Sequence, residues 1–138
     1  QHKDEIKSMI ESVLRQYKEN GIGRWAAVEK ETGNVIGWTG LKFVVNETNK
    51  HVNYYDLGYR FIRKYWGKGY AYETAKASVR YGFNTMRLNE IFAMADSGNI
   101  ASNKILKKSG LKFIETFTFQ DVEHNWYHLK KKDWEGFQ

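Results

Sequence analysis

The sequence of 138 residues contains no cysteine and no proline. The absence of cysteine excludes a disulfide framework, a thiolate zinc site and a covalent cysteinyl intermediate within this chain. No apolar run approaches the ~20 residues that a helix needs to span a bilayer. Residues 1–5 also lack the apolar core of a signal peptide. We therefore expect a cytoplasmic protein that does not enter a membrane.

The histidines do not form a zinc motif. The chain has four of them, and only His124 and His128 are four residues apart. That spacing brings two ligands together on a helix, whereas residues 122–130 have the composition of a strand. We expect structural histidines and no metal site.

The composition is that of one globular domain covering residues 1–138. Hydrophobic residues make up 41% and charged residues 28%, which are ordinary proportions for a folded chain of this length. A formal charge of +6 and a pI near 9.4 favour anionic partners: nucleic acid, acidic lipids or a phosphorylated small molecule. Charge alone does not choose among them.

Hydrophobic spacing and turn residues divide the chain into helices and strands. Apolar residues at intervals of three and four predict helices, and β-prone runs between glycine- or asparagine-rich breaks predict strands. The predicted helices are about 4–19, 70–86 and 100–108, and the predicted strands are about 24–29, 35–45, 52–62, 91–95, 111–119 and 122–130. This order indicates an α/β (α+β) fold, in which a mixed sheet has helices on both faces.

Glycines mark the centre of this arrangement. Gly58, inside the strand 52–62, indicates a bulge or a place where a ligand comes near. Gly67 and Gly69 follow that strand within the cation-rich run 63–71. Glycine lets the backbone turn sharply near a ligand, and a helix that begins there presents free N–H groups to an anion. The run is a candidate phosphate cradle, although an ordinary strand-to-helix turn would use the same glycines.

Two motifs resemble those of the GNAT superfamily of N-acetyltransferases, most closely the RimJ/RimL-type ribosomal-protein N-terminal acetyltransferases. The first lies in residues 56–59 and 65–73. Its loop, Gln/Arg-x-x-Gly-x-Gly/Ala in the family, here begins with Lys64, which keeps the charge. The second is an asparagine, a serine three residues on, a short helix and a glycine, here Asn99, Ser102 and Gly110. Two motifs in this order are more specific than either alone.

The resemblance covers about residues 24–130 and implies the GNAT fold. That fold has a mostly antiparallel sheet with helices on both faces and a bulged central strand that opens a slot for the cofactor. Leu111 replaces the phenylalanine that usually follows the second glycine. Relatives begin with another strand and helix before the segment that starts here at Gln1, so we expect the chain to lack that part of the acceptor side.

The cofactor implied by the resemblance is acetyl-CoA, with no metal. The loop amides and lysines would bind the pyrophosphate, the main chain before the loop would pair with the pantetheine arm, and a lysine would lie near the 3′-phosphate. Asn99 would bond the pantetheine arm or cap the helix 100–108. The residues assigned to the cofactor are Phe61, Ile62, Arg63, Lys64, Trp66, Gly67, Lys68, Gly69, Tyr70, Ala71, Asn99 and Lys104.

The catalytic residues implied by the resemblance are Asp56 and Ser102. Most of the superfamily places a tyrosine, which protonates the departing thiolate, where Leu106 stands here. Ser102 would stabilise that thiolate instead, unless it is an ordinary serine of a helix start. Asp56 would take the proton of the amine, directly or through water, unless it is a salt-bridged strand carboxylate. Glu73 suits the positive end of a helix, and we do not assign it a catalytic role.

The predicted function is direct transfer of an acetyl group to a primary amine: a protein N-terminus, a polyamine or another small amine. A homodimer is compatible with this interpretation. Aromatic side chains that would line the acceptor cleft, or simply form core, are Trp25, Trp38, Trp126, Tyr54 and Tyr55. Two other hypotheses remain: a non-catalytic acyl-CoA-binding module or sensor, and a nucleic-acid binder suggested by charge alone.

Overall fold

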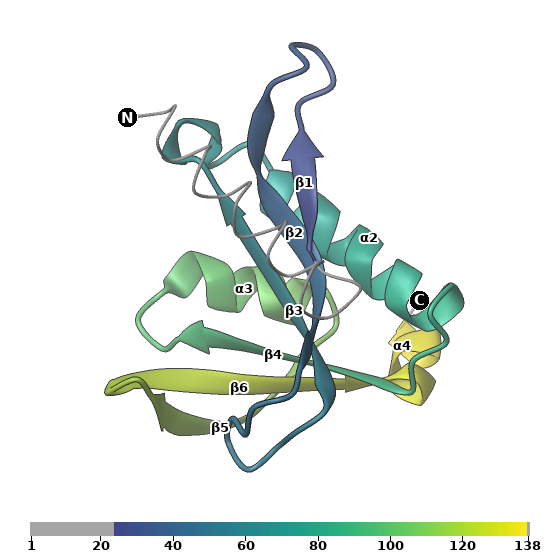
Figure 1. Ribbon diagram of the computed structural model, residues 1–138, viewed down its shortest axis with the longest axis vertical. Coiled ribbons are helices and arrows are strands. Elements are labelled where there is room, and N and C mark those ends of the chain that lie inside the picture. The colour runs from purple at the N-terminus through teal and green to yellow at the C-terminus, as the bar shows by residue number, and fades with distance from the viewer. Residues whose placement is uncertain (1–23, 138) are drawn as a thin grey trace.

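The computed structural model describes residues 24–137, so the predicted helix 4–19 lies outside the described residues. Figure 1 shows a twisted sheet with helices packed on it. In chain order the elements are β1 (Trp25–Val28), β2 (Val35–Val44), β3 (Tyr54–Phe61), the 3-10 turn η1 (Arg63–Tyr65), α2 (Tyr70–Asn84), β4 (Glu90–Asp96), α3 (Ile100–Lys108), β5 (Lys112–Phe119), β6 (Val122–Lys130) and α4 (Lys131–Phe137). No helix in this part of the chain is both long and apolar enough to cross a membrane.

The sheet has six strands in the order β1-β2-β3-β4-β6-β5. Every neighbouring pair is antiparallel except β3 and β4, which are parallel and joined through α2. Parallel neighbours need such a crossover because the chain must return to the same end of the sheet. The predicted mixed, mostly antiparallel sheet is confirmed.

The strands β3 and β4 separate after a short contact. Their ladder consists of the pair Asp56 and Phe92, whereas β3 pairs with β2 along its full length, from Tyr54 to Phe61. Figure 1 shows the carboxyl ends of β3 and β4 moving apart, toward the starts of α2 and α3 respectively. The second half of β3 therefore has a strand partner on one side only.

Gly58 does not interrupt the pairing of β3 with β2, because the register continues without a shift through the pair Gly40 and Gly58. The expected bulge is therefore absent from this ladder. A Cβ atom added at Gly58 would collide with the guanidinium of Arg24. The group that approaches the backbone of Gly58 is therefore the Arg24 side chain, which a larger residue would displace.

The main core lies on the face of the sheet that α2 and α3 cover. Helix α2 buries Ala75, Ser78, Val79 and Gly82 there, and these small residues bring the helix close to the sheet. Trp134 of α4, a helix that the sequence did not predict, joins the same cluster. The sequence predicted helices on both faces of the sheet, and one of the predicted helices, 4–19, lies outside the described residues.

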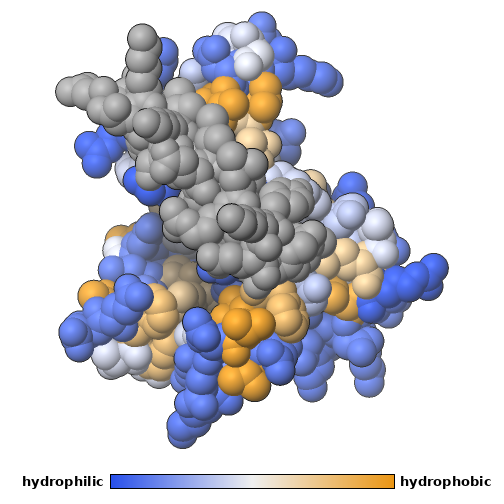
Figure 2. All heavy atoms as spheres, in the orientation of Figure 1, coloured by the Kyte–Doolittle hydropathy of each residue, from blue (hydrophilic) through white to orange (hydrophobic). Residues whose placement is uncertain are grey.

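Side chains on the surface are mainly hydrophilic in the view of Figure 2. The hydrophobic atoms visible there form separate small groups, on the β1–β2 hairpin and at the lower centre, rather than one broad patch. Val28 of the hairpin is 56% exposed. Single exposed hydrophobic residues of this kind are normal and do not by themselves mark an interface.

Candidate functional site

The loop between β3 and α2 is an open array of backbone N–H groups. Gly67 and Gly69 have φ angles of +80° and +83°, and a Cβ added to either would meet nothing within 4 Å. The first bond that closes a turn of α2 runs from the N–H of Glu73 to the carbonyl of Gly69, at 3.0 Å. Within the described part of the chain, the amides of residues 67–72 have no hydrogen-bond partner. These amides have the conformation that the predicted anion cradle requires.

Cations surround this loop. Arg63, Lys64 and Lys68 are exposed, and the ammonium groups of the two lysines lie 5.7 and 5.3 Å from the ring of Tyr65. The Nζ of Lys108, at the end of α3, lies 4.4 Å from the ring of Tyr72 in the first turn of α2. The positive end of the α2 dipole adds to these charges. The loop is electrostatically suited to a phosphate group.

The main chain before the loop turns alternate peptide groups toward the gap between β3 and β4. The N–H of Ile62 donates to the carbonyl of Ile36 at 2.8 Å, so Ile62 faces β2. In an antiparallel ladder the neighbouring residues turn the other way, so Tyr59 and Phe61 face the gap. Of the predicted main-chain residues only Phe61 is placed there, because Arg63 already belongs to η1.

The side chain of Trp66 binds one of the main-chain groups that face the gap. Its indole N–H donates to the carbonyl of Phe61 at 2.7 Å, although the residue is 60% exposed. The guanidinium of Arg63 lies 5.4 Å from the indole ring. The Phe61 carbonyl is therefore engaged by the protein itself, while the peptide groups of Tyr59 remain turned to the gap.

A pocket of about 190 Å³ lies where β3 and β4 diverge. It contains both predicted catalytic residues, Asp56 from β3 and Ser102 from α3. Met94 on β4 and Leu106 on α3 are among its apolar lining residues. The remaining lining residues are Arg24, Trp38, Leu57, Gly58 and Tyr59.

Asp56 forms a buried ion pair with Arg24. The guanidinium Nη2 of Arg24 donates to Oδ2 of Asp56, and the side chains are 7% and 12% exposed. The other carboxylate oxygen, Oδ1, is buried and has no hydrogen-bond partner among the described residues. Burial raises the pKa of Asp56, while the charge of Arg24 opposes that rise. Asp56 is therefore the salt-bridged strand carboxylate that the sequence analysis gave as an alternative. Its Oδ1 remains without a hydrogen-bond partner among the described residues.

Ser102 is in contact with a residue that the sequence did not single out. The hydroxyl oxygen of Tyr59 lies 3.1 Å from Oγ and 3.2 Å from the carbonyl oxygen of Ser102. Burial raises the pKa of the Tyr59 phenol to about 12. Tyr59 therefore stays protonated at neutral pH and acts as a hydrogen-bond donor.

Asparagines fix the start of α3. Oδ1 of Asn99 accepts the backbone N–H of Ser102 at 3.0 Å, which is the predicted helix cap. Asn103, missed by the sequence, donates to the carbonyls of Asp96 and Asn99 at 3.0 and 2.7 Å. Its Oδ1 accepts from Tyr127 at 2.6 Å and from the Asn125 side chain at 2.8 Å. These bonds tie the helix that carries Ser102 to β4 and β6.

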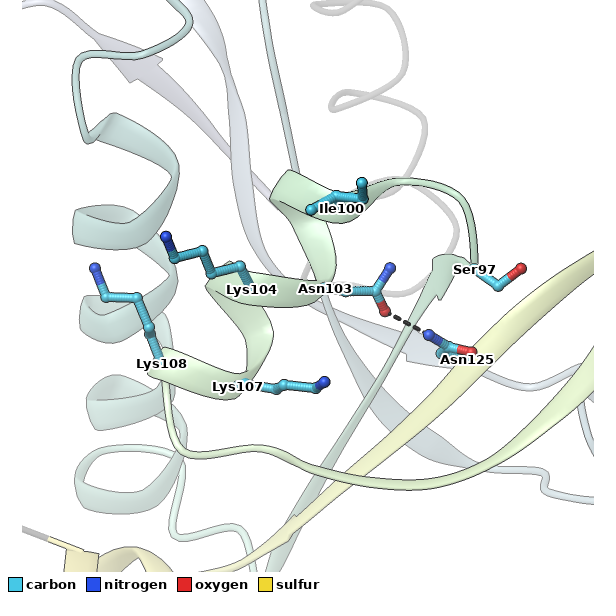
Figure 3. Close-up of a pocket in the computed structure, with 7 residues that line it drawn as sticks. All are labelled: Ser97, Ile100, Asn103, Lys104, Lys107, Lys108 and Asn125. Atoms are coloured by element: carbon cyan, nitrogen blue, oxygen red, sulfur yellow. Dashed lines mark hydrogen bonds between the residues drawn. The ribbon is translucent and has the colours of Figure 1, made fainter.

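Lysines line a groove of about 410 Å³ beside α3, shown in Figure 3. Lys104 and Lys108 extend from α3 toward α2, whereas Lys107 lies on the other side of the helix. The hydrogen-bonded pair Asn103 and Asn125 lies at the inner side of the groove. The predicted 3′-phosphate residue Lys104 is thus near α2 and on the same side as Lys108.

The predicted cleft aromatics lie in different places. Tyr54 and Trp126 are 7% and 1% exposed and pack with Phe92 in a separate buried cluster, so they are core. The Trp25 ring meets the edge of Tyr81 on α2, with centroids 4.9 Å apart, and Tyr55 packs against Phe43. Among the five, Trp38 alone lines the pocket, where the Arg24 guanidinium lies 4.9 Å from its ring.

Comparison with known proteins finds a matching family and relatives that are longer than this chain. The sequence profile described as acetyltransferase (GNAT) domain matches residues 1–112. An uncharacterized protein of Bacillus subtilis (strain 168), YkkB, is 35% identical over 102 residues, which are 74% of this chain and 58% of that protein. The uncharacterized N-acetyltransferase p20 of Bacillus licheniformis is 32% identical over 119 residues, 86% of this chain and 64% of that protein. The chain spans 58% and 64% of the length of these two relatives.

Among solved structures, the ribosomal-protein-S5-alanine acetyltransferase of Vibrio fischeri is similar with a TM-score of 0.72. The match covers 93% of this chain and 72% of that chain at 19% identity, so it shows a shared fold. The fold and the profile match agree: the chain belongs to the GNAT acetyltransferase family.

Proposed function

We propose that the chain carries the donor and reaction site of an acetyl-CoA-dependent N-acetyltransferase that passes acetyl directly to a primary amine. The observation that carries the proposal is the array of amides at residues 67–72, which have no hydrogen-bond partner among the described residues and lie where β3 separates from β4. A pyrophosphate supplies the acceptor oxygens that these donors lack. Members of the GNAT family use acetyl-CoA, which contains such a group.

The donor would lie along the gap between the two strands. Its pyrophosphate would accept from the amides of Gly67 to Tyr72, with Lys64 and Lys68 beside it. The pantetheine arm would pair with the peptide groups of Tyr59 and the N–H of Phe61 as an added strand does, since the Phe61 carbonyl is held by Trp66. Lys104, close to α2, is the candidate for the 3′-phosphate.

The reaction needs a deprotonated amine, because an ammonium has no lone pair. The amine nitrogen would form a bond to the thioester carbon, and the carbon–sulfur bond would break with its electron pair going to sulfur. The amine proton would pass to Oδ1 of Asp56, directly or through a water, since Oδ2 is held by Arg24. A hydrogen bond from Ser102 would stabilise the thiolate. No covalent enzyme intermediate is involved.

The acceptor in this proposal is a small amine or a protein N-terminus, as in the RimJ/RimL type. The pocket supports an amine because Oδ1 of Asp56 has no hydrogen-bond partner among the described residues, whereas Arg24 holds Oδ2 and lies over the ring of Trp38. A carboxylate oxygen accepts a hydrogen bond from an amine N–H. The Vibrio fischeri protein, named for acetylation of a ribosomal-protein alanine, gives one example of an N-terminal acceptor on this fold.

A second function, a non-catalytic acyl-CoA-binding module, is favoured by one observation. The ion pair with Arg24 holds the carboxylate that would act as the base. Asp56→Asn and Ser102→Ala discriminate between the two functions. An enzyme loses turnover in both variants while the affinity for acetyl-CoA remains, and a binding module has no turnover to lose.

The donor site is tested by calorimetric titration with acetyl-CoA. We expect saturable binding by the wild type and its loss in Gly67→Asp, because the new carboxylate repels the pyrophosphate. Gly33→Asp is the matched control: Gly33 has a φ of +75° and an equally open environment, but lies in the β1–β2 turn. Binding that is absent in the wild type, or equal in Gly67→Asp and the wild type, would refute the proposal. Thiol release with a panel of amines, including peptides with varied first residues, then identifies the acceptor.

A further inference from the structure

The hydroxyl of Tyr59 can donate its proton to either of two oxygen atoms of Ser102. The phenol has one proton and two acceptors within reach on the same residue, the Ser102 carbonyl at 3.2 Å and Oγ at 3.1 Å. When the phenol donates to the carbonyl, the serine hydroxyl is free to donate back to the phenol oxygen. When the phenol donates to Oγ, the proton of the serine is left for a third group.

The third group has a place in this structure. Tyr59 and Ser102 line the same pocket, on the side where the peptide groups of β3 have lost their β4 partner. In the proposed function the thioester sulfur lies in this pocket near Ser102. A developing thiolate accepts hydrogen bonds only, so it favours the arrangement in which the serine proton points into the pocket.

We infer that Tyr59 is a positioning residue that turns the Ser102 hydroxyl toward the departing thiolate, an inference that rests on the proposed function. The charge on sulfur is stabilised by the Ser102 proton, and Oγ in turn accepts the Tyr59 proton. No proton needs to leave the phenol. A chain of two hydrogen bonds polarises both members and strengthens the bond to sulfur.

The ring and the hydroxyl of Tyr59 have separable roles. The ring packs against both core clusters that flank β3, around Leu57 and around Phe61. The hydroxyl makes its contacts with Ser102 alone among the described residues. Because burial raises the pKa of Tyr59 to about 12, the phenol keeps its proton through the neutral range. Tyr59→Phe therefore removes the donor and keeps the packing.

The experiment compares the wild type, Tyr59→Phe, Ser102→Ala and the double variant by acetyl-CoA calorimetry and steady-state thiol release. We expect Ser102→Ala to lower kcat about 100-fold and Tyr59→Phe to lower it about 10-fold. The KM and Kd for acetyl-CoA should stay at the wild-type values. The kcat of the double variant should equal that of Ser102→Ala, because Tyr59 acts only through the serine hydroxyl. Tyr81→Phe, on α2 and outside the pocket, is the control for loss of a phenol group.

The outcomes separate this inference from the proposed function. A wild type with no acetyl-CoA binding or turnover overturns the proposed function and the inference together. A wild type that turns over, with Tyr59→Phe unchanged, overturns the inference alone. Losses in Tyr59→Phe and Ser102→Ala that multiply in the double variant also overturn it, because Tyr59 would then act independently of the serine.

Discussion

Asn103 offers the most direct test of how the site is held in place. It is 8% exposed and makes four side-chain hydrogen bonds, which join α3 to the end of β4, to its own first turn and to β6. The substitution Asn103→Leu keeps nearly the same shape and removes all of these bonds. Tyr127 is the residue most affected, because it is 0% exposed and its hydroxyl loses the Asn103 oxygen to which it donates.

The magnitude follows from counting the groups left unpaired. A buried hydroxyl without a partner costs roughly 1–3 kcal/mol, and each lost bond to a carbonyl that water can reach costs about 1 kcal/mol or less. We expect Asn103→Leu to lower the free energy of unfolding by about 3 kcal/mol, a large share of the 5–15 kcal/mol typical of a domain. Tyr127→Phe removes one bond and leaves Asn103 its other partners, so it should cost about 1 kcal/mol.

Urea unfolding followed by tryptophan fluorescence measures these free energies, since the chain has five tryptophans. The double variant Asn103→Leu/Tyr127→Phe contains no orphaned phenol. It should therefore be more stable than the sum of the single effects predicts, by about 1–2 kcal/mol. Single effects that simply add, to within about 0.5 kcal/mol, would refute the argument that the Tyr127 hydroxyl depends on Asn103.

Three further predictions concern the loop, the core and pH. Trp66→Phe frees the carbonyl of Phe61 from the indole N–H, so calorimetry should show acetyl-CoA binding strengthened severalfold; weaker binding would count against it. Gly82→Ala places a methyl 2.7 Å from Leu41 Cδ1. Overpacking of about 1–3 kcal/mol should then exceed the helix-propensity gain of about 1 kcal/mol, and an unchanged or higher urea midpoint would contradict this. Because burial raises the pKa of Tyr59 from 10.0 to about 12, the folded state holds that proton more tightly than the unfolded chain. The stability difference between wild type and Tyr59→Phe should be constant below pH 10 and shrink as pH rises through about 12, and urea unfolding at pH 9 and pH 11 should show it; a constant or growing difference contradicts the shift.

Most of the described fold could be predicted because its signals are local. The β1–β2 hairpin turns at Gly33, whose φ is +75°, and α3 ends before Gly110, whose φ is +101°, so glycine marks both boundaries. Helix α4 was missed because β6 runs to Lys130 and the helix follows at once, without a break or a repeated apolar spacing. The Trp134 ring of this helix is held by a tertiary contact with Phe83, with centroids 5.0 Å apart.

The parts of the site that are formed by backbone groups could be predicted from the sequence, whereas the side-chain contacts could not. The anion cradle depends on left-handed φ angles at Gly67 and Gly69, and a glycine pattern in the sequence indicates that conformation directly. The ion pair of Arg24 with Asp56 joins residues 32 apart, and the contact of Tyr59 with Ser102 joins residues 43 apart. No spacing rule reaches over such separations, so these partners appear only when the sheet is assembled.

The two halves of the proposed site therefore differ in how freely they can change. The donor half uses main-chain groups, whose positions depend on backbone conformation and tolerate most side chains near them. The acceptor half is a pocket of side chains brought together from β2, β3, β4 and α3, among them Trp38 and Met94. Substitutions at such positions alter the shape and charge around the amine and leave the loop amides untouched. Under the proposed function we therefore expect acceptor specificity to depend on a few side chains of this pocket rather than on the loop amides.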